Sequence, residues 1–81
     1  MNEIQDFIIN YITENASHNA EGLNEDTNFI ETGLLDSYAI LNLFITLESV
    51  YNIKFTPQDF ARPELHIIGQ LSLHIKTKMS P

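Results

Sequence analysis

The chain has 81 residues, no cysteine, and eleven acidic residues against four basic ones, which gives a formal net charge of −7. A chain of this length forms one small domain, and without cysteine it has neither disulfides nor thiolate metal ligands. All acidic residues but two precede the first basic residue, Lys54. Such a charge distribution disfavours nucleic acid and anionic lipid and attracts basic partners, although it would also serve solubility alone.

The sequence contains no sign of a secretory or membrane segment. The first ten residues, MNEIQDFIIN, are acidic and lack the basic region and cleavage site of a secretory signal. The longest apolar-rich stretch, Gly33 to Leu47, is too short and too polar to span a bilayer. We therefore expect a cytoplasmic monomer. The start at Met1 without flanking linkers favours a free-standing protein, although a domain cut from a larger protein would look the same.

Apolar residues near the amino terminus repeat with helical spacing and predict an amphipathic helix over about residues 2–15. Its apolar face consists of Ile4, Phe7, Ile8, Tyr11 and Ile12. Residues 16–36 are polar and rich in turn formers, which predicts a long loop. Loops of this length are usually functional or disordered, and hydrophobic anchors near its end favour a functional loop. These anchors are Phe29, Ile30, Leu34 and Leu35.

The rest of the chain predicts further helices. A second helix covers about residues 37–52, and a short helical turn about residues 58–61 lies between two prolines. A last helix covers about residues 64–76 and ends near Lys76 and Lys78, where cations suit the helix dipole. No alternation typical of strands persists. The expected fold is one all-α domain over residues 1–81, a small bundle of three main helices plus one short helix.

The second helix has an apolar surface wider than one core contact needs. One arc faces the core and consists of Ile40, Leu43, Phe44, Leu47, Val50 and Tyr51. A neighbouring stripe, spaced at three, four and three residues, consists of Tyr38, Leu41, Ile45 and Glu48. The apolar members of this stripe either pack under the long loop or the short helix, or form an exposed strip that binds partner proteins.

An acidic residue and a hydroxyl, Asp36 and Ser37, stand where the second helix begins. In isolation this dipeptide is usually a helix cap. A helix amino terminus also offers unpaired N–H groups and the positive end of the dipole, which favour an attached phosphate. Gly33 supplies backbone freedom for the turn into the helix. Ser37 is therefore either part of a cap or a hydroxyl displayed for attachment.

The stretch GLLDS resembles the attachment motif of the acyl carrier and peptidyl carrier protein family. The resemblance covers nearly the whole chain, because the first helix, the loop ending in FIETGLLDS, the helix YAILNLFITLESVYNIKF and the TPQDF segment follow in the family's order. It implies an acyl-carrier-like right-handed bundle. It also implies that a phosphopantetheinyl transferase attaches 4'-phosphopantetheine from coenzyme A to Ser37, with Asp36 assisting the docking of that enzyme.

The same resemblance implies a carrier that performs no bond chemistry itself and is therefore not an enzyme. The arm holds acyl or aminoacyl cargo as a thioester, loaded by an activating ligase and passed to acyl-transferring or condensing enzymes. The positions that match partner contacts are Leu35, Asp36, Tyr38, Leu41, Ile45 and Glu48.

The second helix departs from carriers of fatty acid synthesis, which are similar but place several acidic residues along it. Here it carries only Glu48, while Asn42 and Thr46 occupy positions that are often charged in those carriers. This difference favours a specialised carrier, and the GLLDS motif is also similar to that of D-alanyl carrier proteins. The identity of the cargo is chosen by the loading enzyme and is not written in the carrier.

Other chemistries fit the sequence less well. The sequence has three scattered histidines, His18, His66 and His74. Their spacing builds neither a nucleophile elbow in which one of them pairs with Ser37 nor a zinc site made by the three together. A calcium loop that starts at Asp26 fails, because its required glycine and glutamate positions hold other residues. The remaining alternative is an unmodified acidic helical adaptor that binds a partner helix through the strip of Tyr38, Leu41 and Ile45.

Overall fold

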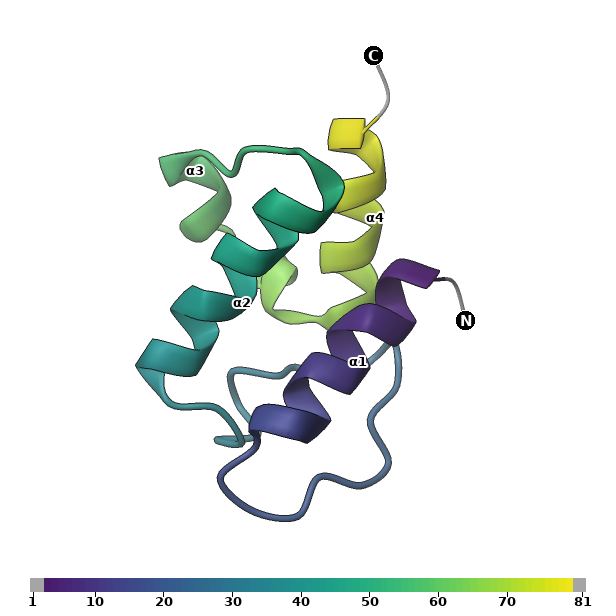
Figure 1. The fold of residues 1–81 in the computed structure, drawn as a ribbon, viewed down its shortest axis with the longest axis vertical. Coiled ribbons are helices and arrows are strands. Elements are labelled where there is room, and N and C mark those ends of the chain that lie inside the picture. The colour runs from purple at the N-terminus through teal and green to yellow at the C-terminus, as the bar shows by residue number, and fades with distance from the viewer. Residues whose placement is uncertain (1–2, 80–81) are drawn as a thin grey trace.

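The computed structural model describes residues 3–79, and its elements are helices joined by irregular segments (Figure 1). They are α1 (Glu3–Asn15), α2 (Ser37–Tyr51), α3 (Pro57–Phe60), the 3-10 helix η1 (Pro63–His66) and α4 (Ile68–Met79). The expected start of the first helix at residue 2 lies outside the described residues. The prediction of a small all-α bundle is confirmed.

The core is built from the apolar faces of the long helices. α1 buries Ile4, Ile8 and Ile12 and packs against α4, which buries Leu71 and Ile75. Complete burial of one such side chain stabilises the fold by about 1.5–3 kcal/mol. From α2 the core receives Leu43, Phe44 and Leu47. The helical spacing in the sequence therefore identified the packed faces of these helices.

One residue of the expected core arc of α2 lies outside the core. Val50 is 52% exposed, whereas Leu43, at the same helical angle two turns earlier, is fully buried. Val50 belongs to the last turn of α2, immediately before its end at Tyr51. Angle around a helix predicts which face points inward, but it does not tell which turns a neighbouring element covers.

The long loop is held to the start of α4 by backbone hydrogen bonds. Ile68 N–H donates to Thr27 O at 3.0 Å, and Gly69 N–H donates to Glu25 O at 2.8 Å. In the opposite direction Phe29 N–H donates to His66 O at 2.9 Å, and the Phe29 side chain is fully buried. The loop thus wraps one end of the molecule, where α1 ends and α2 begins, as an ordered segment (Figure 1).

These hydrogen bonds correct the prediction of one continuous last helix over residues 64–76. Ile67 has extended backbone angles, φ −96° and ψ 127°, and forms an isolated antiparallel bridge with Asn28. The chain therefore leaves η1 at His66 and begins α4 at Ile68. Ile67 itself keeps hydrogen bonds to Glu64 and Leu71, whereas its neighbours His66 and Ile68 bond to the distant loop segment, an effect that local sequence patterns do not report.

Candidate functional site

Asp36 is the N-cap of α2, and Ser37 is the first residue of the helix. Asp36 has extended backbone angles, φ −78° and ψ 174°, and its Oδ1 accepts the N–H of Ala39 at 2.8 Å. Its carbonyl oxygen accepts the N–H of Ile40 at 3.0 Å. Gly33 enters this turn with φ +68°, in the left-handed region that glycine adopts without strain. The cap is therefore complete without the hydroxyl of Ser37.

Ser37 is an exposed residue, and its hydroxyl has no hydrogen-bond partner within residues 3–79. The backbone N–H groups of Ser37 and Tyr38 likewise donate to no group in this part of the chain. Unpaired amides at the positive end of a helix stabilise an anion such as a phosphate. The residues at the start of α2 therefore fit a phosphodiester attached to Ser37, with no existing bond to break first.

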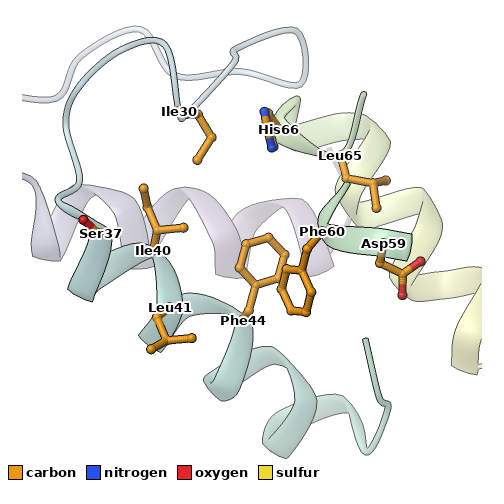
Figure 2. Close-up of a pocket in the computed structure, with 9 residues that line it drawn as sticks. All are labelled: Ile30, Ser37, Ile40, Leu41, Phe44, Asp59, Phe60, Leu65 and His66. Carbon is orange, nitrogen blue, oxygen red and sulfur yellow. The ribbon is translucent and has the colours of Figure 1, made fainter. Parts of the chain in front are cut away.

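Ser37 also stands at the edge of a cavity of about 270 Å³ between α2, α3, η1 and the long loop (Figure 2). The wall is mostly apolar, and Phe60 of α3 lies edge-on against Phe44 of α2 with ring centroids 5.2 Å apart. The cavity is lined by Ile30, Ser37, Ile40, Leu41, Phe44, Asp59, Phe60, Leu65 and His66. An apolar group tethered to Ser37 would therefore find a sheltered site next to its point of attachment.

The apolar stripe of α2 is an exposed surface and not a contact with the loop or α3. Tyr38 is 75% exposed, Leu41 55% and Ile45 51%. We call these three residues the α2 strip. Solvent-exposed apolar residues at helical spacing are typical of a surface that binds partners.

Two other residues that the family resemblance assigned to partner contacts make contacts within the chain instead. Leu35 is only 6% exposed and belongs to the hydrophobic core, because the turn before Asp36 directs its side chain inward. The Oε2 of Glu48 accepts the N–H of Phe55 at 2.8 Å and so holds the segment that follows α2. The sequence-based assignment of Leu35 to a partner surface is thus corrected, and Glu48 is tied to its own chain.

The structure brings together a cluster that sequence reasoning missed. Asp59 of α3 is 7% exposed; its Oδ1 lies 2.8 Å from His74 Nε2 and its Oδ2 lies 2.9 Å from Lys78 Nζ, both on α4. Oδ2 also accepts the N–H of Thr56 at 2.7 Å, and the Thr56 hydroxyl accepts the N–H of Asp59, which forms a capping box. The Thr-Pro-Gln-Asp spacing was the sequence signal for this box.

The ionisation of Asp59 follows from this environment. Burial acts to raise the pKa of Asp59, but hydrogen bonds from Thr56 N–H, Lys78 and His74 hold the pKa well below its ordinary value. The carboxylate is therefore charged throughout the neutral range, and it ties α3 to the end of α4.

Within residues 3–79 no hydrogen bond joins Ser37 to any of the three histidines. His18 lies in the exposed loop with Nδ1 3.2 Å from Ser17 Oγ, His74 is bound to Asp59, and His66 lines the cavity. Within residues 3–79 no group of three or more histidine, aspartate or glutamate side chains is placed to hold a metal ion. None of the helices in this part of the chain has the length and hydropathy required to cross a bilayer.

Comparisons with known proteins support a carrier. No protein-family model and no solved structure matches the chain. The chain is 31% identical to the acyl carrier protein of Chlamydia caviae over 75 residues, which cover 93% of this chain and 95% of that protein. It is 29% identical to the D-alanyl carrier protein of Staphylococcus saprophyticus over 62 residues, 76% of this chain and 80% of that protein. Together with the helical fold, this similarity shows that the chain belongs to the acyl carrier protein family.

Proposed function

We propose that residues 1–81 form a single carrier domain that bears 4'-phosphopantetheine on Ser37 and presents a thioester-linked cargo to partner enzymes. One observation carries this proposal above the others. Ser37 is an exposed residue whose hydroxyl lacks a hydrogen-bond partner within residues 3–79 and stands beside the unpaired amides of Ser37 and Tyr38 at the start of α2.

In the attachment step the bond between Ser37 Oγ and phosphorus forms as the pyrophosphate P–O bond of coenzyme A breaks. The hydroxyl proton is lost and adenosine bisphosphate leaves. The free amides at the start of α2 stabilise the negative phosphodiester, and Asp36 offers the transferase the carboxylate oxygen that does not cap the helix. The arm supplies a thiol that holds acyl groups, while the chain supplies the attachment point and the recognition surface.

The α2 strip is the surface that we assign to the partners: the phosphopantetheinyl transferase, the ligase that loads the cargo, and the enzymes that receive it. Its three side chains flank the attachment site on the same helix and are at least half exposed. Along α2 the only acidic residue is Glu48, whose carboxylate bonds Phe55 N–H. Docking on α2 therefore depends more on apolar contact than on a row of charges.

This surface favours a specialised pathway over fatty acid synthesis, and a D-alanyl or other aminoacyl cargo is consistent with the Staphylococcus saprophyticus relative. A cytoplasmic location, where coenzyme A-dependent enzymes act, belongs to the same proposal.

The proposal is tested by intact mass after coexpression with a broad-specificity phosphopantetheinyl transferase. We expect the native chain to gain the mass of one phosphopantetheine and Ser37→Ala to gain none. Ser49→Ala is the matched control, because Ser49 is an exposed serine on the same helix and should leave the modification intact. A native chain that never gains mass, or a Ser37→Ala chain that still does, contradicts the assignment.

An unmodified helical adaptor is the second candidate, because the exposed α2 strip alone would suit a partner helix. The same mass measurement separates the two functions. If the native chain stays unmodified while Leu41→Glu abolishes binding to a partner, the adaptor function replaces the carrier.

A further inference from the structure

The wall of the cavity beside Ser37 includes one imidazole whose ring nitrogens are available. Neither ring nitrogen of His66 has a hydrogen-bond partner within residues 3–79. The other ionisable side chain of the wall, Asp59, has both carboxylate oxygens occupied by His74, Lys78 and Thr56. Among the lining residues of this cavity, His66 is therefore the polar side chain that can still bind something, apart from Ser37 itself.

The position of His66 is set by its surroundings. Its backbone oxygen accepts the N–H of Phe29 at 2.9 Å, and its ring meets the Phe29 ring edge-on with centroids 6.5 Å apart. Figure 2 shows the imidazole at the cavity edge between Ile30 and Leu65, on a different wall from Ser37. A neutral imidazole both donates and accepts a hydrogen bond, so a fixed ring here can orient a ligand that carries a polar group.

We infer that His66 makes this cavity shelter a short acyl cargo that bears a hydrogen-bonding substituent, such as a hydroxyl group, better than a cargo without one. This inference rests on the proposed function, since the cargo reaches the cavity from Ser37. The cavity, at about 270 Å³, is smaller than most ligand sites, which suits a short chain. A purely hydrocarbon chain would remove water from the His66 ring without replacing its hydrogen bonds, which is unfavourable. A hydroxyl group on the cargo replaces them.

The test compares two cargoes that differ by one hydroxyl group. A broad-specificity transferase loads the chain from butyryl-coenzyme A or 3-hydroxybutyryl-coenzyme A, and hydroxylamine then cleaves the thioester. The cleavage rate on the protein is divided by the rate for the same free acyl-pantetheine, which gives the protection of each cargo. We expect the 3-hydroxybutyryl group to be roughly fivefold better protected than the butyryl group, the effect of one typical hydrogen bond.

Two variants connect this protection to His66. His66→Phe keeps a ring against Phe29 but removes both nitrogens, and should equalise the two cargoes by lowering only the protection of the 3-hydroxybutyryl group. His66→Gln keeps a donor and an acceptor and should retain most of the difference. If His66→Phe fails to fold, the native chain still decides the question, through the nitrogen chemical shifts of its His66 ring.

In the native chain those shifts should move with 3-hydroxybutyryl cargo and not with butyryl cargo, while the exposed ring of His18 serves as the internal control. Equal protection of both cargoes, or a difference that survives in His66→Phe, overturns the inference and leaves the carrier function intact. A chain that accepts no phosphopantetheine at all overturns the carrier function and this inference with it. The two failures are therefore distinguished by mass before any cleavage is measured.

Discussion

The carboxylate of Asp36 accepts the backbone N–H of Ala39 at 2.8 Å, so the residue that closes the start of α2 is the neighbour of Ser37 and not Ser37 itself. The two side chains have different roles: Asp36 accepts a helix amide, whereas the Ser37 hydroxyl bonds to no group in the described part of the chain, residues 3–79. Loss of the hydroxyl should then change the free energy of unfolding by no more than about 0.5 kcal/mol, as for an ordinary surface substitution. Attachment to Ser37 therefore need not disturb the helix.

Substitutions at Asp36 should separate its cap from its charge. Asp36→Asn keeps an oxygen that can accept the Ala39 N–H, so stability should stay within about 0.5 kcal/mol, because Asn caps as well as Asp. Asp36→Ala removes the cap and should lower the free energy of unfolding by about 1 kcal/mol. Urea denaturation measures both effects.

The rate of phosphopantetheine attachment then reports on the charge of Asp36. If the transferase needs the carboxylate, Asp36→Asn and Asp36→Ala slow attachment equally, despite their different stabilities. If the attachment rate is normal in Asp36→Asn and slow only in Asp36→Ala, the role of Asp36 is limited to capping the helix.

A charged residue in the α2 strip should impair docking more than folding. Ile45 is 51% exposed, so Ile45→Glu should leave the melting temperature nearly unchanged and slow loading of the cargo at least several-fold. Leu73→Glu is the matched control, since Leu73 is 59% exposed on α4, a different helix from the strip. The measurements are the loading kinetics and the thermal melting of both variants. Equal losses of loading in both would show that α2 is not the docking surface.

The buried carboxylate that ties α3 to α4 should contribute measurably to stability. Asp59→Asn removes the charge paired with Lys78 and His74 and should lower the free energy of unfolding by about 1–3 kcal/mol. Glu64→Gln provides the contrast, because its ion pair with Arg62 is 3.5 Å long and about half exposed. Surface pairs of this kind contribute less than about 1 kcal/mol. Similar effects of both substitutions would argue against a special role for the Asp59 cluster.

The same carboxylate predicts a dependence of stability on pH. The pKa of Asp59 is depressed in the folded chain relative to its ordinary value of 3.8, because hydrogen bonds from Thr56, Lys78 and His74 outweigh its burial. Its contribution is therefore fully present above about pH 4 and is lost as the pH falls from there towards the folded pKa. In urea titrations at several pH values, the difference in stability between the native chain and Asp59→Asn should shrink below pH 4. A constant difference down to pH 2 would contradict this linkage.

A methyl group at Gly69 should loosen the long loop. The Cβ of an alanine there would lie 2.9 Å from the backbone oxygen of Glu25, closer than real contacts allow. Gly69→Ala should therefore lower the free energy of unfolding by about 1–3 kcal/mol, although alanine is the better helix former by about 1 kcal/mol. Gln70→Ala, an exposed neighbour in α4, should change it by less than about 0.5 kcal/mol. Urea denaturation measures the free energy of unfolding of both variants. If Gly69→Ala left this free energy unchanged, the loop would have moved away from the added methyl group.

Family membership and the all-α fold follow from features that a sequence displays directly. The helical repeat of Ile4, Ile8 and Ile12 reports the buried face of α1, because a helix brings residues three and four apart onto one side. The GLLDS motif is local, so it pointed to Ser37 and to the family that the comparison with Chlamydia caviae shows. The attachment of phosphopantetheine to Ser37 stays a prediction.

What the sequence by itself determined is the approximate extent of the helices apart from the break at Ile67, most of their inward faces, and the location of the hydroxyl at a helix start. Only the tertiary structure decided that Leu35 is buried while Tyr38 is exposed, that Asp59 meets His74 and Lys78, and that His66 shares a cavity with Ser37. The physical reason is that periodicity describes one element at a time. The burial of a residue by a neighbouring element, the pairing of charged side chains and the lining of a cavity all depend on segments that are far apart in the chain and meet only after packing.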